Sequence, residues 1–441
     1  MSPHSAPPLV PDVFDPRLYA EGIPHDRYRV LRDHHPVAWQ EERAVLGWPA
    51  GPGFWAVTRH ADVVRVLKDS GTFSSHLGAT QIRDPDPADL PFIRRMMLNQ
   101  DPPDHGRLRR LVSRAFTPRR VDRFEARARE RARSLIAAAV RRAGDTDGTF
   151  DVVSAVTDEY ALLNLADLLG VPPADRGLLL HWTRRVIGYQ DPDEATAPVL
   201  GPDGKPVNPR SPAQLRDMFD YARALAADKR RRPGGVGAGR TGDGARPAGD
   251  HDDHDIMTTL ACDPELTEQE LEMFFFLLTV AGNDTVRSAA PGRLLALAGH
   301  PGEYARLRRG DVGTGTAVDE LLRHHPPVLS FRRTAARDTE LAGTRIAAGD
   351  KVVVFHASAH HDERVFTDPH RLDLSRSPNP HVAFGEGPHV CLGAHFARLQ
   401  LRVFYEEITR TLPALRLAAP PRRLVSHFIN GLKSLRFEAP T

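Results

Sequence analysis

The sequence predicts a mainly α-helical protein with a small β component, folded as a single large domain. Apolar residues recur at helical spacing over residues 104–143 and 150–188, and again in a long stretch from Thr267 past Gly282. Strand-like alternation is confined to short segments. Hydrophobic residues make up 41% and charged residues 26% of the chain, the balance of a globular protein, and no internal repeat divides it.

The composition excludes several classes of protein. A net charge of +2 gives no sign of a nucleic-acid partner, and two cysteines cannot form a disulfide framework. Residues 1–19 are proline-rich and lack the basic and apolar regions of a signal peptide. The longest apolar stretch, residues 273–282, is about half a membrane span and is predicted to be a buried core helix. We therefore expect a soluble, cytoplasmic protein without a membrane anchor.

In the first half of the chain, residues 54–58 predict a short strand, and a helix is expected from Arg59. Residues 190–212 carry six prolines and predict a loop. The low-complexity residues 230–255 predict a disordered surface connector. This connector ends in HDDHD, which could suggest a metal site. A solvated polar run is favoured instead, because a disordered segment does not hold ligands in a fixed geometry.

In the second half, the long helix opens with a capping-box pattern formed by Thr267 and Glu270. A further helix is expected directly after Cys391. The remaining predicted elements are helices at 303–309 and 316–324 and β-hairpins at 339–357 and 428–440.

The stretch "HVAFGEGPHVCLGAHFARLQ", residues 381–400, places Cys391 in a glycine-rich loop before that last helix. A cysteine that serves only as packing needs no glycines around it, although an inert cysteine in a glycine-rich turn remains the alternative. The loop resembles the haem-binding loop of cytochromes P-450, with the pattern F-G-x-G-x-H-x-C-x-G. The residues that carry it are Phe384, Gly385, Gly387, His389, Cys391 and Gly393.

This resemblance extends over nearly the whole chain and implies one P-450 domain, residues 1–441, with the long central helix over haem. It implies haem b, iron protoporphyrin IX, with the Cys391 thiolate as the iron ligand. Residues without a Cβ would let the porphyrin lie close to the backbone. Backbone N–H groups after the cysteine would stabilise the negative sulfur.

The segment "AGNDT" lies within the central helix and includes Ala281, Gly282, Asp284 and Thr285. Without the resemblance, it could equally be a polar patch on a core helix. The resemblance implies an oxygen-binding kink here, with Ala281 and Gly282 next to the cofactor. A mid-helix glycine costs about 1 kcal/mol against alanine, and a mid-helix threonine can bond back to a carbonyl. Asp284 and Thr285 would form the acid–alcohol pair that passes protons to oxygen.

Glu320 and Arg323 are spaced i, i+3 and therefore share a helix face. An isolated E-x-x-R is weak evidence, but here the resemblance implies a buried structural ion pair that holds the cysteine loop. Arg371 is the predicted third partner, in Pro369-His370-Arg371-Leu372, and Arg376 is its rival.

The haem propionates need basic partners in a partly dry site. The resemblance implies a set of four, His105, Arg109, Arg333 and His389. Four further arginines would form a basic patch, for which a solvated face is favoured over a surface that docks an acidic ferredoxin. These are Arg107, Arg110, Arg114 and Arg119.

The activity that the resemblance implies is a haem-thiolate monooxygenase that hydroxylates an apolar small molecule, such as a terpenoid, steroid, lipid or polyketide, with O2. Two electrons would come from NAD(P)H through a separate ferredoxin and ferredoxin reductase. "AGNDTVRSA" and "SPNPHVAFG" resemble bacterial hydroxylases of sterol side chains, methyl-branched lipids and terpenes. A monomer with a role in secondary metabolism is expected. The alternatives are a peroxygenase of the same fold and a haem-binding protein without turnover.

Overall fold

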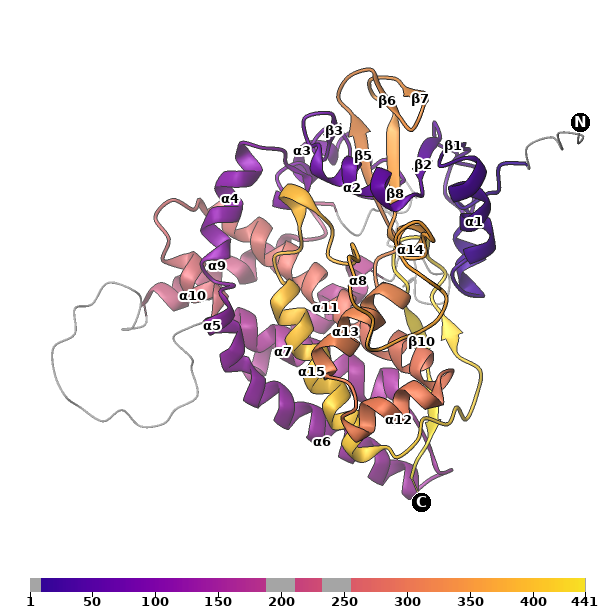
Figure 1. Cartoon of the computed structure of the whole chain (residues 1–441). Helices are drawn as coiled ribbons and strands as arrows, with labels where there is room; N and C mark the ends of the chain where they lie inside the picture. The colour runs from indigo at the N-terminus through magenta and orange to yellow at the C-terminus, as the bar shows by residue number, and fades with distance from the viewer. Residues whose placement is uncertain (1–8, 188–210, 232–254, 441) are drawn as a thin grey trace, which may run out of the picture.

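The computed structural model describes residues 9–187, 211–231 and 255–440, and Figure 1 shows their arrangement. A body of helices makes up most of the molecule, and the largest sheet lies at one edge of it. The predicted loop at 190–212 and most of the predicted connector at 230–255 lie outside the described residues. The helices are α1 (His25–His34), α2 (His60–Lys68), α3 (Leu90–Ile93), α4 (Asp104–Ser113), α5 (Pro118–Val121), α6 (Glu125–Gly144), α7 (Asp158–Leu169), α8 (Arg176–Ile187), α9 (Arg216–Arg231), α10 (Ile256–Ala261), α11 (Glu268–Ala298), α12 (Pro301–Arg309), α13 (Thr314–His324), α14 (His356–Ala359) and α15 (Ala394–Thr411).

The helix α11 runs through the core and carries the predicted proton-transfer segment. Its capping box is present, because the Thr267 side chain accepts from the Glu270 N–H while the Glu270 carboxylate accepts from the Thr267 N–H. The apolar run is buried as predicted, with Phe275 fully enclosed. Side chains of α6, α7, α11 and α15 belong to one large apolar cluster. Burial of this cluster supplies the main driving force for folding and fixes α11 in place.

The largest sheet has five strands in the order β1-β2-β8-β5-β3, and β2 and β8 are its parallel pair. Arg333 lies on β5 of this sheet, paired with Val352 of β8. The hairpin predicted at 339–357 is confirmed as β6 and β7, after which the chain enters β8. The strands are β1 (Val37–Gln40), β2 (Phe54–Val57), β3 (Phe73–Ser74), β4 (Thr149–Asp151), β5 (Ser330–Ala335), β6 (Thr339–Leu341), β7 (Thr344–Ile346), β8 (Lys351–Phe355), β9 (Arg422–Arg423), β10 (Leu432–Ser434) and β11 (Arg436–Glu438).

Three sequence expectations differ from the structure. The helical stretch 104–143 is divided into α4, α5 and α6, and Pro118, which donates no backbone N–H, begins a new helix. The hairpin predicted at 428–440 is wrong, because β10 pairs with β9 and β11 pairs with the distant β4. Asp255, the last residue of HDDHD, is buried rather than solvated. It caps α10 and pairs with Lys229 at 2.6 Å.

Among the described residues, no helix is both long and apolar enough to cross a membrane. The apolar run of α11 is instead covered by other helices, as expected for a core helix.

Candidate active site

The cysteine loop approaches the end of α2 so closely that a side chain would not fit at Gly387. A Cβ there would lie 2.7 Å from the Leu67 carbonyl oxygen, and Gly387 also has a φ of +68°. Gly385 likewise has a positive φ of +72°. These conformations favour glycine, because a Cβ clashes with the backbone in the left-handed region. At Gly387 the close neighbour is the backbone of α2, an additional reason for a glycine that the cofactor argument did not foresee.

Cys391 lies at the end of this loop, three residues before α15 begins. Its N–H donates to the Phe384 carbonyl oxygen at 2.7 Å, which closes the loop on itself. The residue keeps solvent exposure, whereas Cys262 is only partly exposed. The surrounding protein desolvates the thiol and raises its pKa. A hydrogen bond from Gly393 and the charges of Arg109 and Arg398 act in the opposite direction, in favour of the thiolate.

Phe384 and Gly393 frame the cysteine. The guanidinium carbon of Arg398 lies over the Phe384 ring, 4.3 Å from the ring centroid. This cation–π contact holds the loop against α15. Gly393 is the N-cap residue of α15, so Cys391 lies close to the positive end of that helix dipole. The helix and the two arginines therefore favour the thiolate, although the larger effect of desolvation still raises the pKa of Cys391.

The four predicted basic residues converge on one region. The rings of His105 and His389 lie 4.1 Å apart, and His389 shares a 3.3 Å hydrogen bond with Ser75. Burial lowers the pKa of His389, and the nearby charges of Arg333, His105 and Arg109 lower it further. Burial lowers the pKa of Arg333 to about 10 and that of His105 to about 4. Each of these groups is therefore held where its charged form is disfavoured.

The arginines of this basic cluster have no carboxylate in an ion pair among the described residues. Arg333 is 4% exposed and donates to the carbonyl oxygen of Arg332 at 2.9 Å. Within the described part of the chain, neither Arg333 nor Arg109 forms an ion pair with a carboxylate. The nearby Asp101 carboxylate instead accepts hydrogen bonds from Ser74 and from the Ser75 N–H. Buried cations are normally paired, so this arrangement suits a ligand that brings its own carboxylates.

An accessible stripe crosses the middle of α11. Leu277, Ala281 and Thr285 are spaced four residues apart and share one helix face. Ala281 is exposed and the other two are partly exposed, while Asn283 and Asp284 between them are buried. The Thr285 hydroxyl donates to the Ala281 carbonyl oxygen at 2.8 Å. The face therefore offers apolar surface with one hydroxyl oxygen.

Gly282 does not interrupt α11, whose backbone stays helical throughout. A Cβ at this position would lie 2.8 Å from the Leu165 side chain of α7. The glycine therefore makes room for close packing of two helices, in addition to any role towards the cofactor.

Asp284 is 4% exposed and points toward a chain of charged groups that the sequence analysis missed. Its carboxylate lies 3.9 Å from the guanidinium of Arg287, one turn further along α11. Arg287 in turn pairs with Asp158 of α7 at 2.6 Å. The i, i+3 spacing of Asp284 and Arg287 is a signal that the sequence did contain.

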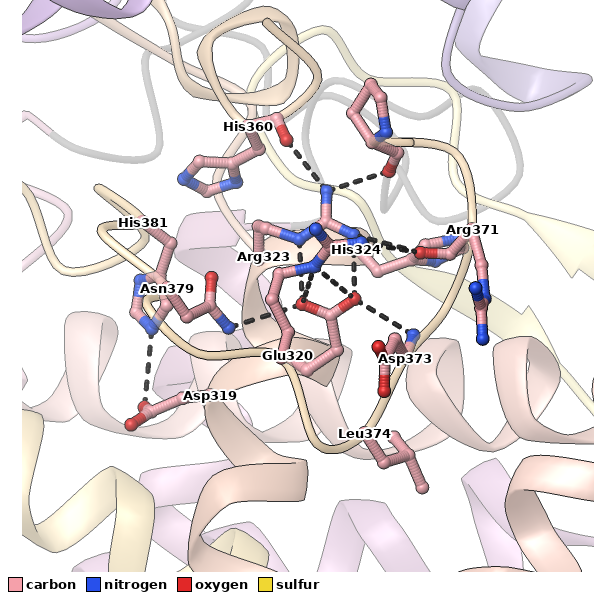
Figure 2. A network of polar contacts seen from close by, with 12 residues as sticks. Asp319, Glu320, Arg323, His324, His360, Arg371, Asp373, Leu374, Asn379 and His381 are labelled. Carbon is pink, nitrogen blue, oxygen red and sulfur yellow. Dashed lines mark hydrogen bonds and ion pairs between the residues drawn. The ribbon is translucent and has the colours of Figure 1, made fainter. Parts of the chain in front are cut away.

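The predicted ion pair between Glu320 and Arg323 is present and wholly buried, with both side chains 0% exposed. Two parallel hydrogen bonds of 2.8 Å join them, as Figure 2 shows. Arg323 also donates to the carbonyl oxygens of His360 and Pro369, each at 2.8 Å. Glu320 also accepts from the Asp373 N–H. This one pair therefore fixes the backbone at His360 and between Pro369 and Asp373, both more than 30 residues after the pair in sequence.

The prediction of Arg371 as third partner is wrong, and its rival Arg376 takes that place. Arg376 Nε donates to both Glu320 carboxylate oxygens at 3.1 Å. The Arg371 side chain is exposed, and its backbone carbonyl accepts from Arg376 instead. The side chains of Leu372 and Leu374 are buried in this segment, whereas the side chain of Arg371 is exposed. Arg376, further along the chain, reaches the Glu320 carboxylate instead.

The neighbouring residue Asp319 holds the cysteine loop from its other side. His381 donates to Asp319 at 3.3 Å and Arg398 donates to it at 2.8 Å. Burial opposes ionisation of Asp319, but these hydrogen bonds outweigh it and lower its pKa. Figure 2 shows the contact between Asp319 and His381. Adjacent residues of α13 therefore anchor the segment before Cys391 and, through Arg398, the helix after it.

These residues fit a haem group. An exposed thiol at a helix N-terminus is a suitable ligand for haem iron, and the cations without carboxylate partners are suited to two propionates. The accessible face of α11 provides apolar surface for a substrate.

Comparisons with known proteins agree with this geometry. The model of the family "Cytochrome P450", here written P-450, matches residues 314–422. The chain is 36% identical to the steroid C26-monooxygenase of Mycobacterium tuberculosis (strain ATCC 25618 / H37Rv) over 432 residues, 96% of this chain and 91% of that protein. It is 37% identical to the methyl-branched lipid omega-hydroxylase of the same strain over 415 residues, 92% of this chain and 89% of that protein.

A solved structure is similar over the same extent. The cytochrome P-450 of Mycobacterium marinum in complex with pseudoionone has a TM-score of 0.77 and 37% identity, and 96% of each chain is covered.

The ion-pair network predicts unequal effects for its two neighbouring arginines. Arg376→Ala removes charge-assisted bonds to a buried carboxylate and should lower the free energy of unfolding by about 1.5–3 kcal/mol. Arg371→Ala, the matched control, should change it by less than about 0.5 kcal/mol because its side chain is exposed. Glu320→Ala should cost about 3–5 kcal/mol, because Arg323 is left buried without its partner.

Urea unfolding of the purified variants measures these differences, and the haem content of each preparation provides a second readout. Equal destabilisation by Arg371→Ala and Arg376→Ala would contradict the assignment of Arg376.

Proposed function

The chain belongs to the cytochrome P-450 family and is a monooxygenase that uses cysteine-ligated haem, and we propose that it hydroxylates the end of a branched apolar chain. Candidate substrates are terpenoids, steroid side chains and methyl-branched lipids. The proposal is supported by relatives named for oxidation at C26 and at the omega position, and by a structural neighbour in complex with pseudoionone. The observation that carries it is the accessible Leu277–Ala281–Thr285 face in the middle of the core helix α11.

The residues around Cys391 would hold the cofactor. Cys391 would be the iron ligand, with Phe384, Gly385 and Gly393 shaping the loop around it. His105, Arg109, Arg333 and His389 would bind the propionates. When bound, the haem supplies the binding and reductive activation of O2. The Arg109 and Arg398 charges and the Gly393 hydrogen bond stabilise the sulfur in its anionic form.

Protons would reach the site through the polar residues of α11. The Thr285 hydroxyl donates to the Ala281 carbonyl, so its lone pairs remain able to accept a hydrogen bond from a water molecule. Asp284 is the neighbouring acid, and Arg287 and Asp158 continue from it toward partly exposed positions. We assign Asp284 to proton uptake from this side and Thr285 Oγ1 to holding, as an acceptor, the water that would deliver the proton at the accessible face.

Electrons would come from separate proteins. NAD(P)H would supply them through a reductase and a ferredoxin. Arg110 and Arg119 are exposed on α4 and α5 and suit an acidic partner. Arg114 is also exposed but lies 3.5 Å from Asp263, and Arg107 pairs with Glu270. The same proposal includes a monomeric, cytoplasmic protein that acts in secondary metabolism.

The Cys391 assignment predicts a spectroscopic outcome. The reduced, CO-bound protein should show the long-wavelength Soret band of a haem thiolate, and Cys391→Ala should abolish it, because no other ligand replaces the thiolate sulfur. Cys262→Ala is the control and should retain the band, since Cys262 follows α10 without a glycine frame. Loss of the band in Cys262→Ala alone would reverse the assignment.

The substrate proposal is tested by spectral titration and product analysis. Branched terpenoids, steroids and methyl-branched fatty acids should produce a type I shift, and straight-chain fatty acids of equal length should bind at least about tenfold more weakly, for lack of the methyl contacts. Products formed with a surrogate ferredoxin and reductase should carry the hydroxyl at the chain end. Hydroxylation within the ring system would contradict the proposal.

The same assay distinguishes the alternatives. Turnover with hydrogen peroxide and none with NAD(P)H would indicate a peroxygenase. Spectral shifts without any product would indicate a binding protein.

The proton-transfer assignment predicts uncoupling. Thr285→Ala should keep the thiolate spectrum and still consume NAD(P)H, but product per NAD(P)H should fall while hydrogen peroxide rises. Asp284→Asn keeps the shape and removes the acid, so it should lower kcat by about 100-fold. Product, NAD(P)H and peroxide are measured in parallel. Unchanged coupling in Thr285→Ala would show that protons arrive by another route.

A further inference from the structure

Three histidines from distant parts of the sequence meet on the side of the molecule where α1 and α14 pack together. His25 begins α1, His361 follows α14, and His370 lies in the next loop. Each offers one ring nitrogen, and these three atoms all lie within 4.8 Å of one another. The ring centroids are 4.2 Å apart for His25 and His361, 5.1 Å for His25 and His370, and 5.0 Å for His361 and His370.

The hydrogen bonds leave these rings able to act as ligands. Nδ1 of His361 lies 3.0 Å from the Ala357 carbonyl oxygen. A carbonyl only accepts, so Nδ1 carries the proton and Nε2 keeps its lone pair. Nδ1 of His25 is buried and has no hydrogen-bond partner among the described residues. Buried polar nitrogens are rarely left unpaired, so the His25 Nδ1 atom is available to bind a ligand.

The protonation states also suit metal binding. Burial lowers the pKa of His25 to about 3 and that of His361 well below its ordinary value, so both rings are neutral near pH 7. His370 is exposed, and burial of part of its ring still lowers its pKa. Neutral imidazole is the form that binds a metal, and the exposed His370 provides a path of entry.

We propose that His25, His361 and His370 form a site for a divalent transition metal, Zn²⁺ in the first place, separate from the haem. Three imidazoles and one water give the four-coordinate tetrahedral set that Zn²⁺ adopts. Ligand nitrogens at about 2.0–2.1 Å from zinc lie roughly 3.3 Å apart. The three nitrogens lie within 4.8 Å of one another, so metal binding would require the His370 and His25 rings to move inward to that separation. The bond from His361 to Ala357 is the outer contact that typically orients a ligating histidine.

The charges around the cluster permit a cation. The guanidinium groups of Arg32 and Arg323 are near enough to lower the pKa of His25 and His370. Both have a carboxylate partner, because Arg32 pairs with Glu363 at 3.0 Å and Arg323 pairs with Glu320, which it shares with Arg376. The alternative is a stack of neutral imidazoles without a metal, which satisfies ring packing but leaves His25 Nδ1 unpaired.

The ion-pair network prepares two of the three ligands. Arg323 donates to the carbonyl oxygens of His360 and Pro369, the residues directly before His361 and His370. His324 shares a hydrogen bond with the carbonyl oxygen of His370 itself. The backbone at both ligands is therefore fixed before a metal arrives, which lowers the entropic cost of binding. A bound metal would add α1 to the segments already held by Arg323.

Zinc titration of the haem-loaded full-length protein tests the site. After treatment with a chelator, the protein is titrated with Zn²⁺ against a competing indicator. We expect one tight equivalent per chain and a rise in Tm on zinc addition. His370→Gln, a change at an exposed position, should weaken that equivalent at least tenfold and remove the Tm rise, and His25→Gln should do the same.

His34→Gln is the matched control, because His34 is exposed at the other end of α1 and is not one of the three ligands. It should bind zinc as the unmodified protein does. The haem content and the CO-bound spectrum of each variant confirm that the fold is intact. Two outcomes would overturn the proposal: no saturable equivalent in the unmodified protein, or equal affinity in the His34, His25 and His370 variants, which would indicate adventitious binding only.

Discussion

The buried ion pair between Glu320 and Arg323 is the constraint on which the rest of the site depends. Both side chains are removed from water, so every lone pair and N–H of the pair has to find a partner inside the protein. Those partners are the backbone of the His360–Pro369 region, the Asp373 N–H and Arg376. The adjacent Asp319 adds His381 and Arg398. The position of Cys391 follows from this network, because both flanks of its loop are tied to α13.

A second constraint is electrostatic. Arg333 and His105 are buried, and among the described residues neither forms an ion pair with a carboxylate, although the charge of the nearby Asp101 partly offsets their desolvation. Desolvation makes their charged forms costly, which the lowered pKa values express. Two propionates would supply the missing negative charge in the same place. Binding of the cofactor and stability of the surrounding fold are then thermodynamically linked, since the ligand relieves a cost that the folded chain carries.

The sequence predicted correctly those features that depend on interactions between residues close together in the chain. The capping box at Thr267, the glycine frame of Cys391 and the i, i+3 pair of Glu320 and Arg323 all depend on a few neighbouring residues. Predictions failed where the outcome depended on distant partners. β11 pairs with β4, some 290 residues away by sequence, and no local signal indicates that register. Which of Arg371 and Arg376 contacts Glu320 depends on the path of the chain between them, and the sequence did not indicate that path. The histidine cluster unites residue 25 with residues 361 and 370, which no spacing rule relates.

The contact between Gly282 and Leu165 has a consequence for how this enzyme could change over evolution. Gly282 is the direct neighbour of Ala281 on the accessible face of α11, yet its own Cα faces α7. A bulkier or smaller residue at position 165 would therefore displace α11 from its α7 side and reshape the proposed substrate surface without altering any residue of that surface. New selectivity could arise from substitutions in α7 while the proposed proton-transfer residues and the cysteine loop stay unchanged.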